Sequence, residues 1–395
     1  MRRFLIFLAG VHKWFKRCSL RLRGMTEADL SRARILQGRT WDDFCDTLKA
    51  AGANVLSHGD ADDRTKAEGY RYLSRLIRGG LEAFVEYADP EAPVLRRMVH
   101  ETVKMGADNP DNFYENAVVR GDLDYRITGT RGTVHFLTFS TQKGGYGKGG
   151  GLPPTGFLDS RRLIVDADGC LDIIVSATPH EGNWLPMEKD TGMLMVRQTF
   201  LHRDKEEPAR LTIAPVSAVA PPSPADCRRV DEGLMNAANL VAGASFLFSK
   251  WTRDFRAGEN RLPRFDPATS TAAGGDPDIA YYHSFWRLAP DEALVIEVTP
   301  PDCEHWNFQL NNYWMESLDY RYHRIHINKG TAVVDRDGRV TVVVAHEDPG
   351  HPNWLCTTRL PMGTMCWRWI RATSHPTPAT RVVRLAQLQA TIAHP

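Results

Sequence analysis

The sequence predicts a mainly β protein with helical additions: two internally duplicated, antiparallel, jelly-roll-like β-lobes and an N-terminal helical region. Three observations lead to this prediction. Apolar residues follow a helical spacing through residues 25–118. Short alternating apolar runs, typical of strands, then fill residues 119–215 and return at residues 290–372. The two β regions also share motifs at a nearly constant offset, which indicates a duplication.

The N-terminal part divides into a leader and a helical region. Residues 1–24 are interpreted as a leader, disordered or amphipathic, because their apolar run is short, is closed by basic residues and lacks a small-residue cleavage site. In residues 25–118 we expect one helix that begins near Thr40, a second from about residue 64 to residue 87, and a third over roughly residues 93–105.

Helices are also expected between and after the lobes. Residues 216–289 are assigned to a helical connection and loop, with a helix from about residue 225 to residue 255. Residues 373–395 are assigned to a C-terminal helix, whose spacing runs from residue 377 to residue 392. Within the first lobe, residues 163–165 are expected to form one of the short strands.

The duplication rests on four matched pairs of residues. They are Asp166 and Asp335, Asn183 and Asn353, Arg197 and Arg368, and His135 and His305. The members of each pair are separated by 169 to 171 residues, a constancy that is hard to obtain by chance. Each aspartate opens an Asp-x-Asp-Gly turn. Each asparagine should satisfy loop amides, and we expect the pairs to occupy matching places.

The charge balance excludes several classes of partner. The chain carries 49 Lys and Arg against 48 Asp and Glu, so no net field would attract nucleic acid or an anionic membrane. Its N-terminal apolar run is too short for an integral membrane span. The seven cysteines form no CxxC pair and no glycosylation sequon occurs, which favours a cytoplasmic location. The composition leaves a homo-oligomer open.

No cofactor is expected. The β regions do not alternate with helices and carry no dinucleotide fingerprint. The glycine-rich residues 144–151 contain Lys148, but Gly149 and a Leu-Pro-Pro follow where a phosphate-binding loop would begin its helix. This loop is interpreted either as a flap over a site or as a disordered hairpin tip. No histidine spacing matches a zinc pattern, so no metal site is expected either.

Several motifs resemble those of a bacterial family, domain of unknown function 1214. They lie at residues 68–75, 108–111, 125–132, 183–185, 196–198 and 313–320. The resemblance covers about residues 35–372 and implies a pair of jelly-roll-like β-lobes, in agreement with the repeat. It implies no particular activity.

The densest group of reactive side chains follows the strand that begins at His305. Aromatic walls beside a few polar groups are typical of ligand pockets. The candidate catalytic residues are Glu316, Asp319 and His323 as general bases and Tyr320 as proton donor, with Trp306, Asn311, Tyr313 and Trp314 as substrate-binding residues. The alternative is that the polar face of the strand is solvated and that the acidic and hydroxyl side chains only cap a turn.

Arg197 and Arg368 are two further substrate-binding candidates. Each lies inside an apolar strand, where a charge is costly unless it is paired or faces a ligand. They would then form a clamp for a carboxylate, phosphate or sulfate. The alternative is a structural pair with an acidic residue of the same lobe, which is favoured because both copies of the repeat carry the arginine.

Two functions of different classes follow from these candidates. The first is a cofactor-independent enzyme of hydrolase, lyase or isomerase type that acts on a largely apolar small-molecule substrate in a pocket of the β-lobes. The second is a non-catalytic protein that binds a carbohydrate or lipid-like ligand. A group with a strongly shifted pKa in an enclosed pocket would favour the enzyme, and a shallow aromatic groove would favour the binding protein.

Overall fold

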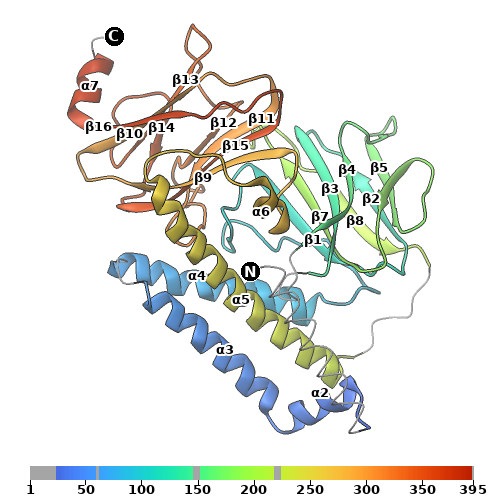
Figure 1. Cartoon of the computed structure of the whole chain (residues 1–395). Helices are drawn as coiled ribbons and strands as arrows, with labels where there is room; N and C mark the ends of the chain where they lie inside the picture. Colours follow the sequence, from blue (N-terminus) through green and yellow to red (C-terminus); the bar gives the residue numbers. More distant parts are fainter. Residues whose placement is uncertain (1–23, 59–61, 146–151, 218–223, 394–395) are drawn as a thin grey trace.

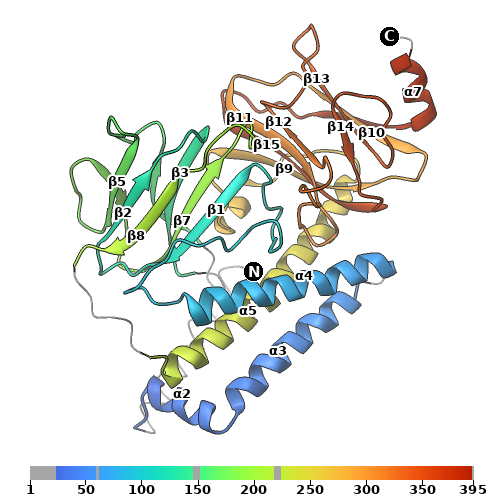
Figure 2. The same ribbon diagram turned by 180° about the vertical axis from the view of Figure 1, so that it is seen from behind.

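Two β-lobes lie side by side over a layer of helices in the computed structural model (Figure 1; Figure 2 shows the reverse side). The structure describes residues 24–58, 62–145, 152–217 and 224–393. The predicted leader, apart from its last residue, and most of the glycine-rich loop therefore lie outside the described residues.

The helical layer agrees with most of the sequence predictions. It consists of α2 (Glu27–Leu36), α3 (Arg39–Leu56), α4 (Asp63–Leu81) with the π-helical turn η1 (Glu82–Glu86), and α5 (Cys227–Phe255). Thr26 and Asp29 form a capping box on α2, and the Asp62 carboxylate caps α4. The apolar faces of α3, α4 and α5 meet in one core around Val55, Tyr72 and Val241.

The predicted helix over residues 93–105 is wrong. This segment has an irregular backbone with bends and a turn, and Arg96 forms a backbone bridge with Asn116. Its apolar residues Met98 and Val103 are buried, and Val103 approaches α4 at Gly79, where an added Cβ would lie 2.9 Å from the Val103 side chain. Docking against α4 and pairing with the sheet outweigh the weak local preference for a helix.

Each lobe consists of two four-stranded sheets. The strands of the first lobe are β1 (Asn112–Val118), β2 (Tyr125–Thr130), β3 (Phe136–Lys143), β4 (Pro154–Asp159), β5 (Cys170–Ser176), β6 (Asn183–Pro186), β7 (Thr191–Thr199) and β8 (Arg210–Pro215). Those of the second are β9 (Ile279–Arg287), β10 (Glu292–Val298), β11 (Cys303–Leu310), β12 (His326–Asn328), β13 (Val340–Ala345), β14 (Trp354–Cys356), β15 (Met362–Ala372) and β16 (Ala379–Arg384).

The two lobes have the same strand order, as the internal repeat predicts. The sheets of the first lobe run β1-β7-β3-β4 and β6-β5-β2-β8, and those of the second run β9-β15-β11-β12 and β14-β13-β10-β16. The pairs β5–β6 and β13–β14 are parallel, and the other strand pairs are antiparallel.

The two matched asparagines make the same contacts. The Asn183 side chain accepts a hydrogen bond from the backbone N–H of Ile164 at 2.7 Å and donates to the carbonyls of Ile164 and Asp172 at 2.8 and 3.0 Å. Asn353 does the same with Val333 and Thr341, at 2.8, 2.7 and 2.9 Å. The prediction that these residues satisfy loop amides is confirmed.

Four strand assignments differ from the predictions. Residues 163–165 form a loop and not a strand, because Asn183 takes up the backbone groups of Ile164. Strands β1 and β9 begin within regions expected to be helical or irregular. The expected C-terminal helix is half strand, since β16 pairs with the edge of β10 and α7 (Leu385–Ala393) starts only afterwards.

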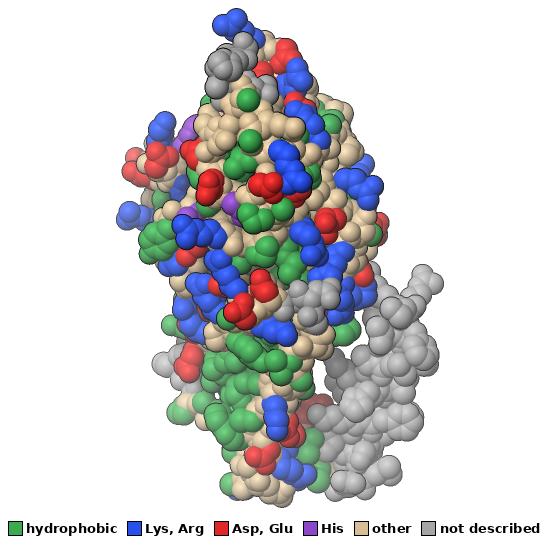
Figure 3. All heavy atoms as spheres, turned by 90° about the vertical axis from the view of Figure 1, so that its left-hand side faces the viewer, with side chains coloured by type: hydrophobic (Ala, Val, Ile, Leu, Met, Phe, Trp, Pro, Cys, Tyr) green, Lys and Arg blue, Asp and Glu red, His purple; other side chains and the backbone are tan. Residues whose placement is uncertain are grey.

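The helices leave several apolar side chains exposed. Trp41 on α3 and Phe246 on α5 are each 60% exposed. Figure 3 shows apolar side chains gathered on the lower, helical part of one face. In the described part of the chain, no helix combines the length and the apolar character needed to cross a bilayer.

Candidate functional site

A cleft of about 160 Å³ lies where the two lobes meet α5. The first lobe contributes side chains of β1 and β7, and the second contributes side chains of β9 and β15. Phe248 and Trp251 of α5 form another wall, and residues 273–275, which follow α6 (Pro267–Ala272), close a further side. Both copies of the repeat therefore line one cavity.

The repeat places an arginine and a tyrosine of each lobe in this cleft. Arg197 of β7 lies opposite Tyr114 of β1, and Arg368 of β15 lies opposite Tyr281 of β9. All four residues line the cavity. Both arginines are predicted from the sequence and the tyrosines are not, although Tyr114 and Tyr281 are separated by 167 residues, close to the offset of the repeat.

Arg368 is a buried charge without a directly bonded counter-ion. Its side chain, in a residue only 4% exposed, donates to the Gln309 amide oxygen and to the Ala107 carbonyl, both at 2.5 Å. Among the described residues, no carboxylate lies within ion-pair distance of Arg368 or of Arg197, whose guanidinium donates to the Gly274 carbonyl at 3.0 Å. The expected structural pair with an acidic residue is therefore wrong, because neutral oxygens take the N–H groups.

Asp108 and Asp111, the two carboxylates that act on Arg368 electrostatically, are bonded to other residues. Asp108 lines the cleft, but its carboxylate accepts hydrogen bonds from the backbone and hydroxyl of Ser317 at 2.9 and 2.7 Å. Burial raises the pKa of Asp108, whereas Lys104 and Arg368 act to lower it. Asp111 interacts with Arg368 only over a longer distance, since it accepts hydrogen bonds from residues of β11 and β12. The two carboxylates thus act on Arg368 from a distance, and neither bonds to its guanidinium.

Aromatic side chains form part of the cleft wall. Trp251 and Phe265 meet edge to face at 5.3 Å, and His283 stacks on Tyr281 at 5.6 Å. Burial lowers the pKa of His283 to about 3, so its imidazole is neutral at physiological pH. Its Nδ1 atom is buried and has no hydrogen-bond partner among the described residues. A neutral ring with a free nitrogen thus lies beside two cationic side chains.

The predicted catalytic residues do not meet in one cavity. Glu316 is fully buried and pairs with Arg75 at 2.6 Å. Asp319 lies at the surface, where hydrogen bonds from Arg321 lower its pKa to about 2. Tyr320 lines a separate surface depression, its pKa is raised by burial, and Lys104 lies 4.6 Å from its ring. His323 is exposed.

The aromatic and amide candidates of the same tract are buried in two different cores. Trp306 stacks on Trp367 at 4.9 Å inside the second lobe. Tyr313 and Trp314 belong to the helical core, where the Trp314 indole donates to the Thr65 carbonyl at 2.8 Å. Asn311 is buried and donates to the Thr364 hydroxyl at 3.2 Å. Of the predicted site residues, only Arg197 and Arg368 line the interlobe cleft.

The chain is similar to a protein family and to a protein of known structure. A family model described as "Protein of unknown function (DUF1214)" matches residues 288–370. The crystal structure of an uncharacterized protein from Burkholderia cenocepacia is 52% identical, with a TM-score of 0.88 over 90% of this chain and 99% of that one. The VPA0106 protein from Vibrio parahaemolyticus is 12% identical, with a TM-score of 0.45 over 80% of this chain and 98% of that one.

No curated protein matches the chain. The Burkholderia relative covers nearly the whole chain at high identity, and the family match falls on the second lobe, from just before β10 into β15. The chain is therefore a member of the DUF1214 family.

Proposed function

We propose that the interlobe cleft binds a small organic carboxylate with a largely apolar body. The observation that supports this proposal is the buried Arg368, which has no carboxylate within ion-pair distance among the described residues, in one cavity with its repeat partner Arg197. A buried charge without a bonded counter-ion is costly, and a ligand anion bonded to it would reduce that cost. A guanidinium group can donate two parallel hydrogen bonds to the two oxygens of a carboxylate. The aromatic side chains of the cleft would bury the rest of the ligand.

The binding test compares an acid with its neutral isostere. We expect 3-phenylpropanoate to bind and raise the melting temperature, and 3-phenylpropanamide to bind far more weakly, because only the acid neutralises the arginines. Arg368→Met and Arg197→Met should each weaken the binding of the acid by about ten- to a hundredfold, since a hydrogen bond to a charged group contributes ~1.5–3 kcal/mol. Titration calorimetry measures both comparisons.

The matched control is Arg126→Met. Arg126 lies on β2, is exposed, and pairs with Asp172 at 2.7 Å, away from the cleft. This variant should bind 3-phenylpropanoate as the wild type does. Equal affinity for the acid and the amide, or an equal loss in Arg126→Met, would contradict the proposal.

The second candidate function is lyase chemistry next to the bound carboxylate, and His283 is the observation that favours it. The free imidazole, with a pKa of about 3, is a weak base, but a bound carboxylate beside it would raise this pKa. His283 could then take the proton from the carbon beside the carboxylate of a 3-hydroxy acid, while the two arginines stabilise the charge that develops on the carboxylate. Burial raises the pKa of Tyr281, so its phenol keeps its proton and could give it to the departing hydroxide. The proton that His283 has taken would then return to the Tyr281 phenolate, on whose ring the imidazole stacks, which restores both side chains. The products would be a 2-enoate and water.

This reaction has a direct optical assay. Incubation with 3-hydroxy-3-phenylpropanoate should produce cinnamate. The ultraviolet absorbance of cinnamate measures its formation. His283→Asn should lower the rate by about a hundredfold or more, the usual effect of losing a general base. His180→Asn, at an exposed position, is the control and should leave the rate unchanged. If the wild type forms no cinnamate while it still binds the acid, the cleft is a binding site only.

A further inference from the structure

We infer that the bound carboxylate carries an extended apolar tail, which runs from the arginines along β1 and β7 into a second pocket. This inference rests on the proposed function of the interlobe cleft. It extends that function by naming the ligand class, a linear monocarboxylate of medium chain length.

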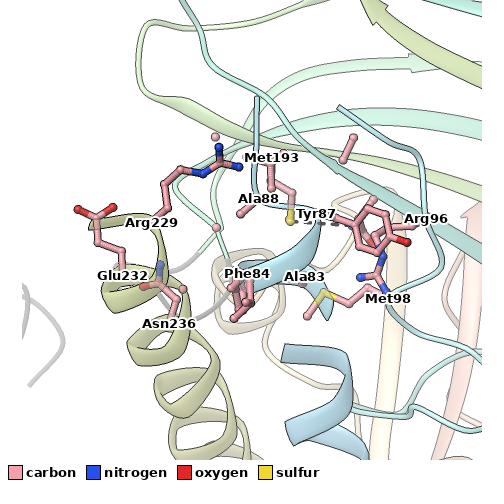
Figure 4. A pocket seen from close by; sticks show the side chains of 17 residues that line it. Ala83, Phe84, Tyr87, Ala88, Arg96, Met98, Met193, Arg229, Glu232 and Asn236 are labelled. Carbon is pink, nitrogen blue, oxygen red and sulfur yellow. Dashed lines mark hydrogen bonds between the residues drawn. The ribbon is translucent and has the colours of Figure 1, made fainter. Parts of the chain in front are cut away.

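The second pocket has a volume of about 140 Å³ and lies between η1, α5 and the edge of the first lobe. Figure 4 shows Arg229 and Asn236 of α5 on one side and Met98 with Arg96 on the other. Phe84, Met98 and Met193 line it, with small side chains such as Ala83 and Ala88 between them. These apolar side chains suit a hydrocarbon chain, and Arg96, Arg229 and Glu232 add charged groups to the lining.

A thin wall separates the two cavities. The Asn116 side chain of β1 lines both of them. Met193 lines the second pocket and Met195 lines the cleft, and the two lie on the same face of β7, about 7 Å apart along the strand. Arg197 is the next residue on that face, so a line of adjacent side chains leads from the arginine to the second pocket.

The side chains of this wall are adaptable. Methionine side chains are unbranched and change rotamer readily. The hydrogen bond that the Asn116 amide donates to a described residue is a weak one, to the Met193 sulfur at 3.9 Å. Moving these side chains would join cavities of about 160 and about 140 Å³, which together reach the lower end of the range of ligand pockets, about 300 Å³. Neither cavity alone reaches that size.

The test is a chain-length series of n-alkanoates from butanoate to decanoate, measured by titration calorimetry on the full chain. We expect the dissociation constant to fall by about fourfold for each added methylene, which corresponds to ~0.8 kcal/mol per buried CH₂, and to level off when the second pocket is full. Ala88→Phe, just after η1, and Asn236→Phe, on α5, each place a large side chain in this pocket. Both should bind butanoate as the wild type does and should lose the gain from longer chains.

The matched control is Ala177→Phe, at an exposed turn of the first lobe. It should reproduce the wild-type series. If affinity in the wild type does not change beyond hexanoate while Arg368→Met still weakens butanoate binding, the inference of a tail is overturned and the carboxylate site stands. If neither the alkanoates nor 3-phenylpropanoate binds, the proposed function itself fails. The wild-type series decides the inference even if both filled variants fail to fold.

Discussion

Glu316→Gln is expected to lower the melting temperature by roughly 10 °C. The carboxylate of Glu316 is 0% exposed and pairs with Arg75 at 2.6 Å. Removing one member of a buried ion pair leaves the other charge uncompensated and costs about 3–5 kcal/mol of unfolding free energy. In a domain of this size each kcal/mol lowers the melting temperature by about 2–4 °C. Thermal unfolding followed by circular dichroism measures the change.

Two further variants separate a structural role of Glu316 from a catalytic one. Asp319→Asn removes the other acidic candidate of the tract, whose pair with Arg321 is at the surface, so the loss should be about 1 kcal/mol or less. The double variant Arg75→Met with Glu316→Leu should recover most of the lost stability, because no unpaired charge remains. A Glu316→Gln protein that keeps its melting temperature but loses 3-phenylpropanoate binding would show that the residue acts in the site.

Asp111→Ala is expected to lower the unfolding free energy by a comparable amount, because Asp111 links the first lobe to the second. The buried Asp111 carboxylate accepts hydrogen bonds from His305 and His326, both at 3.2 Å, and from Asn307 and Asn328, at 2.8 and 2.9 Å. Asp111 immediately precedes β1, whereas all four donors belong to the second lobe. Loss of the carboxylate leaves these buried donors unsatisfied, which should cost about 3–5 kcal/mol.

The loss of stability in Asp111→Ala should depend on pH. Burial alone would raise the pKa of Asp111, but the hydrogen bonds from His305 and His326 hold it well below its usual value. The carboxylate therefore stabilises the fold fully above about pH 4, and this stabilisation is lost as the pH falls further towards the folded-state pKa.

Urea unfolding at about pH 7 and about pH 3 measures the difference between wild type and Asp111→Ala, which should narrow in acid. Asp337→Ala, on an exposed turn beside Arg339, is the control and should cost about 1 kcal/mol or less. A difference between wild type and Asp111→Ala that stays constant with pH would contradict the assignment.

The fold could be predicted at positions where the local backbone requires a particular side chain. Asn183 and Asn353 recur because each must satisfy the same loop backbone groups, and this requirement is visible in the sequence as a repeat. The segment over residues 93–105 could not be predicted in this way, because its backbone pairs with β1 and its apolar side chains pack on α4. Such tertiary contacts are not encoded in the local spacing of apolar residues.

The site could be predicted only in part, for a related reason. A charged residue inside an apolar strand is visible in the sequence, so Arg197 and Arg368 were found. The partner of Arg368 depends on the packing of distant segments and cannot be read from the sequence. The structure places neutral oxygens at its guanidinium where an acidic residue was expected. In the sequence, the polar residues around Glu316 resemble an active site. Buried ion pairs, such as that of Glu316 with Arg75, use the same types of side chain as catalytic groups.

The shared strand order of the lobes has a consequence for the origin of the cleft. One lobe supplies only one arginine and one tyrosine, so a single-lobe ancestor could have built the cavity with two arginines only as a homodimer. Joining the copies through the segment that contains α5 makes the encounter of the two halves intramolecular, with an effective concentration that no longer depends on the amount of protein. The fused halves are then free to diverge, and a formerly symmetric cavity can hold an asymmetric ligand.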